Sequence, residues 1–109
     1  MDIRQLTEEM NRFVTAKGWY EPGTPRPQTP RNLAISLNLE SAEILEHFQW
    51  NDESKDLQGL SEELADVALY LLQLASVSKI DLEQAILQKL QKNYSRQWDG
   101  NTSQEEGKE

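Results

Sequence analysis

Apolar side chains recur every three or four residues through most of the chain, which is the spacing of one face of an α-helix. The first such segment covers residues 3–17 and is followed by Gly18, a type of residue that commonly ends a helix. Three more segments follow, at about residues 30–50, 61–78 and 80–98. No segment shows the alternation of a half-buried β-strand, so the pattern predicts an all-α fold with a four-helix core.

Polar or proline-rich segments separate the predicted helices. All four prolines lie within nine positions, in an irregular loop predicted for residues 19–30. At the end of this loop Thr29 is suited to cap the second helix, and Pro30 is suited to its first position. The polar run 51–59 should end the second helix, with Gly59 as the expected break before the third.

Composition narrows the class of protein. The chain has 109 residues, which fits one domain at residues 1–98 and a small, polar tail at residues 99–109 that we expect to be disordered. It has no cysteine, which excludes a thiolate nucleophile and a cysteine-bound zinc. It has no run of about 18 apolar residues, and its N-terminus is charged from the second residue. We therefore expect a cytoplasmic protein with no membrane partner.

The charge balance narrows the classes of molecule that the protein is expected to bind. The 11 basic and 19 acidic residues give a formal net charge of −8. A groove for a nucleic-acid polymer needs clustered basic side chains, so this class of partner is disfavoured. A single nucleotide stays compatible with an acidic site, because a divalent cation can lie between the phosphates and the carboxylates.

Carboxylates lie beside the apolar faces of two predicted helices. At 100° per residue, Glu40 and Glu43 border the apolar sector of the second helix, and Glu46 lies nearer its outer edge. On the third helix Glu63 has apolar residues on both sides, and Asp66 is one step away on the same side. An isolated buried carboxylate is costly, so this placement calls for a partner.

The two acidic pairs have a spacing that suits a metal site. Residues three apart project from adjacent turns of one face, so two facing helices can bring four carboxylates to one point. Such oxygen ligands favour Mg²⁺ or Mn²⁺. The alternative is a solvated acidic face, which would make the chain a non-catalytic helical interaction module. Glu62 and Gln73 are assigned to the exposed polar strip of the third helix.

A di-iron centre does not fit the sequence. Di-iron helical bundles use a Glu-x-x-His motif on two helices. The only histidine here is His47, and Ile44 stands three residues before it. We therefore place His47 at the edge of a pocket or beside the metal ligands and not among them, and a structural histidine with satisfied hydrogen bonds is the alternative.

With these acids in view, two segments resemble a known family. E-S-A-E of residues 40–43 and E-E-L-A-D-V-A-L-Y-L-L of residues 62–72 resemble the E-x-x-E … E-x-x-D signature of MazG-type nucleotide pyrophosphohydrolases, which belong to the all-α NTP pyrophosphatase superfamily. Residues 29–50 and 80–98 are similar to segments of its small MazG-like and dCTP pyrophosphatase branch. The resemblance implies a helical protein completed by homo-oligomerisation, as a homodimer or a homotetramer built as a dimer of dimers.

The resemblance also implies an activity, which is Mg²⁺-dependent hydrolysis of (deoxy)nucleoside triphosphates between the α- and β-phosphates. The products would be a monophosphate and pyrophosphate, and the role would be nucleotide-pool housecleaning. Residue by residue, the matching metal ligands are Glu40, Glu43, Glu63 and Asp66. Glu46 matches a position that orients the attacking water, and Glu43 and Glu63 count with it as catalytic.

The same resemblance implies a substrate side to the site. Trp50 lies two turns after Glu43 on a continuous helix, and Tyr70 lies one turn after Asp66. Both correspond to positions near the base or sugar, with His47 at the pocket edge. Residues on the phosphate side correspond to Lys89, Lys92, Asn93 and Arg96.

Two points leave the substrate open. A solvated basic helix end, which the helix dipole favours, would explain the late basic residues equally well. The proline-rich loop is longer than in dCTP pyrophosphatases, and Gln28 stands about where they have a histidine. A dUTPase-like or modified-nucleotide pyrophosphohydrolase of the same superfamily is therefore the alternative enzyme.

Overall fold

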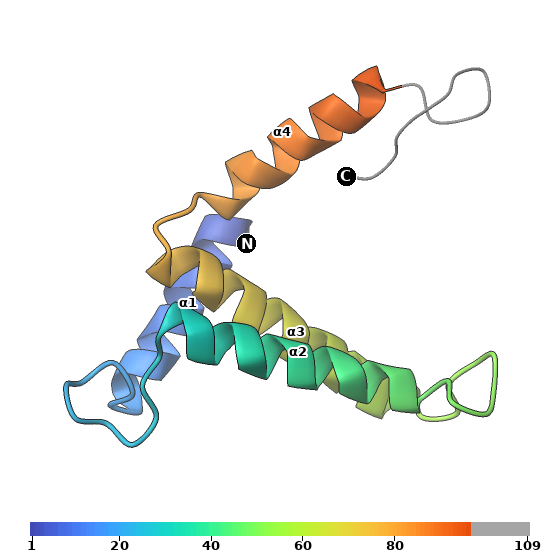
Figure 1. The fold of residues 1–109 in the computed structure, drawn as a ribbon, viewed down its shortest axis with the longest axis horizontal. Coiled ribbons are helices and arrows are strands. Elements are labelled where there is room, and N and C mark those ends of the chain that lie inside the picture. Colours follow the sequence, from blue (N-terminus) through green and yellow to red (C-terminus); the bar gives the residue numbers. More distant parts are fainter. Residues whose placement is uncertain (97–109) are drawn as a thin grey trace.

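The computed structural model describes residues 1–96, and these residues contain helices and no β-strand (Figure 1). The all-α prediction is confirmed. The predicted tail at residues 99–109 and the last residues of the predicted fourth helix lie outside the described residues. The four helices are α1 (Ile3–Ala16), α2 (Pro30–Glu46), α3 (Leu57–Val77) and α4 (Leu82–Ser95).

Each helix begins at a side-chain cap. An oxygen of the capping side chain accepts a hydrogen bond from the backbone N–H three residues later, which satisfies one of the otherwise unpaired donors of the first turn. In α1 the cap is reciprocal, because Gln5 also accepts from the backbone N–H of Asp2 at 2.8 Å. The capping residues are Asp2, Thr29, Asp56 and Asp81.

The connection between α2 and α3 differs from the prediction at both ends. α2 ends at Glu46 and not at Trp50, because the backbone N–H of His47 already bonds the Ile44 carbonyl at 3.1 Å in a tightened last turn. α3 starts one turn earlier than predicted, and Gly59 lies inside its first turn instead of breaking the chain. The Asp56 cap, 2.9 Å from the N–H of Gly59, explains this earlier start.

The helices pack as an antiparallel hairpin with two additions. α2 and α3 lie side by side along their lengths, and α1 crosses them near the end that carries the proline-rich loop (Figure 1). The core between α1 and α3 contains Met10, Val14 and Leu72, with Trp19 packed against it. α4 contacts α1 and α3 near its start and then points away from the hairpin (Figure 1).

A polar network around the buried Gln73 holds the proline-rich loop. Gln73 is only 4 % exposed, so its assignment to the exposed strip of α3 was wrong. Its amide nitrogen donates to the Gln28 side chain at 2.7 Å and lies 3.4 Å from the Tyr20 hydroxyl. That hydroxyl donates to Asn11 at 2.6 Å, and Asn11 donates to Ser76 at 3.0 Å. The burial of Gln73 follows from the loop covering it, which the helix pattern does not contain.

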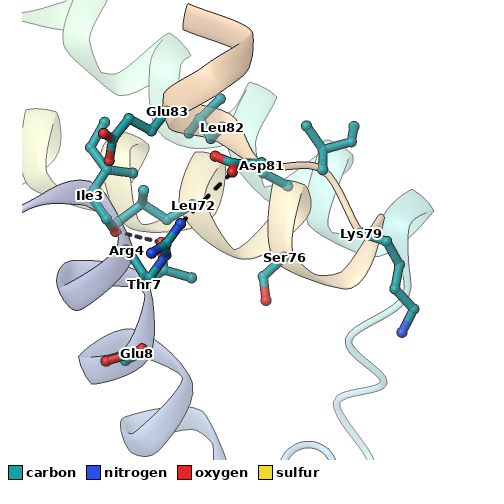
Figure 2. A pocket seen from close by; sticks show the side chains of 12 residues that line it. Ile3, Arg4, Thr7, Glu8, Leu72, Ser76, Lys79, Asp81, Leu82 and Glu83 are labelled. Carbon is teal, nitrogen blue, oxygen red and sulfur yellow. Dashed lines mark hydrogen bonds and ion pairs between the residues drawn. The ribbon is translucent and has the colours of Figure 1, made fainter.

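A hollow of about 340 Å³ lies where α1, the end of α3 and the start of α4 meet (Figure 2). Arg4 reaches across its rim to Asp81, with 4.0 Å between the charged atoms (Figure 2). None of the predicted site residues lines this hollow. It is therefore separate from the acidic half of the hairpin.

Several large apolar side chains stay exposed in the single chain. They occur on all four helices, including the projecting α4, where Leu87 and Leu90 are about half exposed and Tyr94 is 86 % exposed. Apolar surface of this extent on a small helical chain is typical of faces that pack against another molecule. Within residues 1–96, no helix combines the length and the apolarity that crossing a membrane requires.

Candidate active site

The late half of α2 and the early half of α3 carry the predicted acidic pairs, and their antiparallel packing brings the pairs together. The clearest sign is the half-buried Glu40, whose carboxyl pKa is raised above its ordinary value. Partial burial is the largest cause, followed by the negative charges of Glu43, Asp66 and Glu63. The charges of all three residues act on Glu40, so the two acidic pairs lie near one another across the hairpin, as an acidic cluster.

The donor chemistry of this cluster fits a hard divalent cation. It offers carboxylate oxygens only, and a cation would offset the repulsion that, after partial burial, raises the Glu40 pKa. The side chains do not already form a closed set of ligands, since no group of three acids or histidines among residues 1–96 is arranged to hold a metal ion. Glu43 and Asp66 are exposed, so both are in contact with solvent from which a cation would arrive.

His47 contacts the cluster directly. Its Nε2 lies 2.7 Å from Oε1 of Glu63, and its Nδ1 lies 2.9 Å from the Ser54 hydroxyl. The His47 side chain is 12 % exposed and that of Glu63 is 25 % exposed, so the contact is shielded from most of the solvent. Sequence reasoning did not identify Ser54, because its role depends on how the loop at residues 47–56 folds back.

The remaining acids lie at the margin. Glu46 is the last residue of α2 and is exposed, in agreement with the outer-edge position predicted for it. Glu62 is exposed as well, and its carboxylate accepts a hydrogen bond from Gln58 at 3.0 Å. Glu62 therefore belongs to the polar strip of α3 and turns away from the cluster toward its own helix.

The predicted base-side residues are placed differently from each other. Tyr70 lies on α3 one turn after Asp66 and is half-buried, as the helix pattern requires. Trp50 follows the end of α2, so the inference that it shares a helical face with Glu43 was wrong. Its side chain is 84 % exposed. In the single chain, Trp50 therefore forms no wall of an enclosed pocket.

The predicted phosphate-side residues do not reach the acids within one chain. Lys89, Lys92 and Asn93 lie in the second half of α4, and Arg96 follows its last turn. α4 makes no packing contact with α2 in the described structure, and its far end lies apart from the loop that joins α2 and α3 (Figure 1). The single chain thus presents the acidic and basic sets on separate surfaces.

Fold and cluster together define an all-α protein in which a helical hairpin presents two acidic pairs to a shared site. The sequence profile of the MazG-like family matches residues 35–109, which is more than half of the chain. The chain therefore belongs to the MazG-like family, and the resemblance drawn from the sequence is confirmed at this level.

Named relatives add detail. Mouse (Mus musculus) dCTP pyrophosphatase 1 is 35 % identical over 104 residues, covering 87 % of this chain and 56 % of the relative. The human (Homo sapiens) protein of the same name is 34 % identical with the same coverage. The chain thus spans a little over half the length of these relatives. The crystal structure of a pyrophosphatase from Archaeoglobus fulgidus matches with a TM-score of 0.65 and 35 % identity, covering 83 % of this chain and 86 % of that one.

Proposed function

We propose that this chain hydrolyses (deoxy)nucleoside triphosphates between the α- and β-phosphates, with Mg²⁺, and releases a nucleoside monophosphate and pyrophosphate. The observation that carries the proposal is the acidic cluster, in which partial burial and then the charges of Glu43, Asp66 and Glu63 raise the pKa of Glu40. The relatives named dCTP pyrophosphatase 1 and pyrophosphatase support the reaction type. Nucleotide-pool housecleaning is the role that such a reaction would serve.

The proposed roles follow from where each carboxylate stands. Glu40, Glu43, Glu63 and Asp66 would hold Mg²⁺, for which Mn²⁺ is a suitable substitute. The bound cation would offset the charge of the triphosphate and lower the pKa of a bound water.

Glu46, at the open end of α2, would orient the attacking water and accept its proton. The water oxygen bonds to the α-phosphorus, the bond from that phosphorus to the bridging oxygen breaks, and pyrophosphate leaves. Glu43 and Glu63 take part by fixing the position of this reaction centre. The chain needs no covalent nucleophile for this route, which agrees with a sequence without cysteine.

We propose further that the working protein is a homodimer or a homotetramer. The exposed apolar side chains of α2 and α4 support assembly, because a partner would bury surface that the single chain leaves in water. Assembly would also let the α4 residues of one chain approach the acids of another. Lys89, Lys92, Asn93 and Arg96 would then serve the triphosphate, and Tyr70 and Trp50 would serve the base or sugar.

The experiment that tests the activity is a substrate panel. Purified protein is incubated with dCTP, dATP, dUTP, dTTP and modified deoxynucleotides, with and without Mg²⁺, and the products are separated by ion exchange. Monophosphate plus pyrophosphate, formed only with the metal, is the expected result, and the relative rates rank the bases. Diphosphate plus phosphate would contradict the proposed bond cleavage, and no turnover of any substrate would favour the interaction module.

Complementation tests the shared site. Glu63→Gln and Arg96→Ala are each expected to inactivate a homo-oligomer in which the two residues of one site come from different chains. Mixed oligomers of the two variants then contain some sites with both native residues, so activity should return. Mixed oligomers without activity, or a monomeric mass by light scattering, would contradict the assembly proposal.

A further inference from the structure

The loop between α2 and α3 (residues 47–56) is tied to the acidic cluster through one histidine. Both ring nitrogens of His47 are engaged, Nε2 with Glu63 at 2.7 Å and Nδ1 with Ser54 at 2.9 Å. Ser54 is held in turn by Asp56, whose backbone N–H donates to its hydroxyl at 3.1 Å and whose carbonyl accepts from it at 3.2 Å. Asp56 is also the N-cap of α3, so the chain of contacts begins and ends on the same helix.

The available donors and acceptors set the direction of the hydrogen bond between His47 and Glu63. An ionised carboxylate only accepts, so the 2.7 Å contact requires a hydrogen on Nε2 of His47. Nδ1 can then accept from the Ser54 hydroxyl, or donate to it if the ring is charged. In both cases Nε2–H points at Oε1 of Glu63.

We propose that His47 is a positioning residue that fixes the carboxylate of Glu63, and that Ser54 fixes His47. One oxygen of Glu63 is then committed to the imidazole, and the other is left to face a divalent cation. This inference rests on the proposed function, because the cation is what the oriented oxygen would meet. It gives the loop at residues 47–56 a part in the site that its polar sequence does not suggest.

The same contact would also arise if His47 merely joined the end of α2 to the start of α3. The two roles differ in their consequences. A joining residue contributes to the stability of the fold, and its loss lowers the melting temperature without a specific effect on the cation. A positioning residue acts on the ligand it orients, and loss of such an outer contact typically weakens metal binding by about 10–100-fold.

The experiment compares cation binding with folding in four variants. Mn²⁺ binding is followed by electron paramagnetic resonance without nucleotide, and the metal-free melting temperature is measured in parallel. His47→Leu should weaken Mn²⁺ binding by about 10–100-fold. His47→Gln should recover most of this loss because its amide can still donate to Glu63, and Ser54→Ala should show a smaller loss.

Gln58→Leu is the matched control. It removes a donor from the carboxylate of Glu62, one position away on the outer strip, and should leave Mn²⁺ binding unchanged. Unaltered binding in His47→Leu, or equal losses in His47→Leu and His47→Gln, would overturn the proposal. If His47→Leu fails to fold, the comparison of Ser54→Ala with Gln58→Leu tests the proposal instead. Equal Mn²⁺ binding by these two variants would overturn it.

A second readout observes the imidazole ring itself. His47 is the only histidine of the chain, so its ring nitrogens give one unambiguous set of ¹⁵N signals. We expect a protonated Nε2, in the neutral or the charged ring, and signals that respond to added Mg²⁺. An unprotonated Nε2 would overturn the proposal. If the wild-type protein turns over nucleotides but its Nε2 is unprotonated, only the proposed role of His47 is refuted. If the wild-type protein shows no metal-dependent turnover, the proposed function is refuted.

Discussion

The two ends of the α2–α3 hairpin differ in how their polar and charged side chains are paired. At the end with the proline-rich loop, the buried amide of Gln73 finds Gln28 and Tyr20 as hydrogen-bond partners, and the network continues to α1. At the other end, partial burial and the charges of three nearby carboxylates raise the pKa of Glu40. One end satisfies its polar groups within the chain, whereas the other concentrates like charge.

The difference separates a part of the molecule that stabilises the fold from the part that we propose binds the cation. A satisfied buried network rigidifies the fold, and like charges held together lower its stability. Natural proteins tolerate such local costs where a ligand offsets them, so the acidic end is where a cation should bind.

The largest effect is expected from Glu63→Gln, which keeps the shape of the side chain and removes its charge. The cation would lose a ligand and several kcal/mol of charge stabilisation, so turnover should fall about 1000-fold or more. Pyrophosphate release at saturating Mg²⁺ measures this, with circular dichroism to show unchanged helicity. Glu62→Gln is the control, and equal losses in both variants would contradict the assignment.

Stability should change most at the opposite end. Gln73→Leu removes the buried amide and leaves Gln28 without its 2.7 Å donor, so the free energy of unfolding should fall by about 1–3 kcal/mol. Tyr20→Phe should cost less, because that residue is at the surface. Chemical denaturation measures both, with Tyr94→Phe as the control on an exposed hydroxyl. Equal stability of Tyr20→Phe and Tyr94→Phe would remove Tyr20 from the network.

The acidic end should show its cost as a pH dependence. Because the pKa of Glu40 is raised on folding from an ordinary 4.5, its protonation favours the folded state. That contribution is complete below the ordinary value and is lost as the pH rises through the raised one. Glu40→Gln should therefore be more stable than wild type at neutral pH without metal, by on the order of 0.5 kcal/mol.

The advantage of Glu40→Gln should shrink toward acid and should also shrink when Mg²⁺ is added to both proteins. Melting temperatures measured between acid and neutral pH, with and without Mg²⁺, test this. A variant that is less stable than wild type at neutral pH would show that the carboxylates do not repel one another.

The smallest effect is expected from Arg4→Gln at the rim of the hollow. Its partner Asp81 is 4.0 Å away and both side chains are exposed, so the ion pair should contribute at most about 0.5 kcal/mol. Denaturation at low and high salt checks the value. A larger loss would mean that charges outside the hairpin matter as much as those inside it.

Much of the fold follows from the sequence alone. The period of apolar residues predicts four helices and no strand because each helix buries one face. Their ends are harder to predict, since α2 ends and α3 begins through the contacts of His47 and Asp56. Gln73 is polar on a helix and was expected in solvent, and only the loop that covers it explains its burial.

The site divides in the same way. The two acidic pairs follow from residues three apart on neighbouring helices, and the raised pKa of Glu40 agrees with that grouping. The contact between His47 and Ser54 joins residues seven positions apart through the fold of a loop. A loop has no helical periodicity, so this contact could not be predicted from the sequence. The position predicted for Trp50 was wrong for a related reason, because the prediction required α2 to continue to that residue.

The most direct test of the central claim is turnover of a deoxynucleoside triphosphate in water labelled with ¹⁸O, with Mg²⁺ or with a chelator. We expect turnover only with Mg²⁺ and the label in the monophosphate, because in the proposed reaction the water attacks the α-phosphorus. Label in the pyrophosphate, or equal turnover with the chelator, would contradict it.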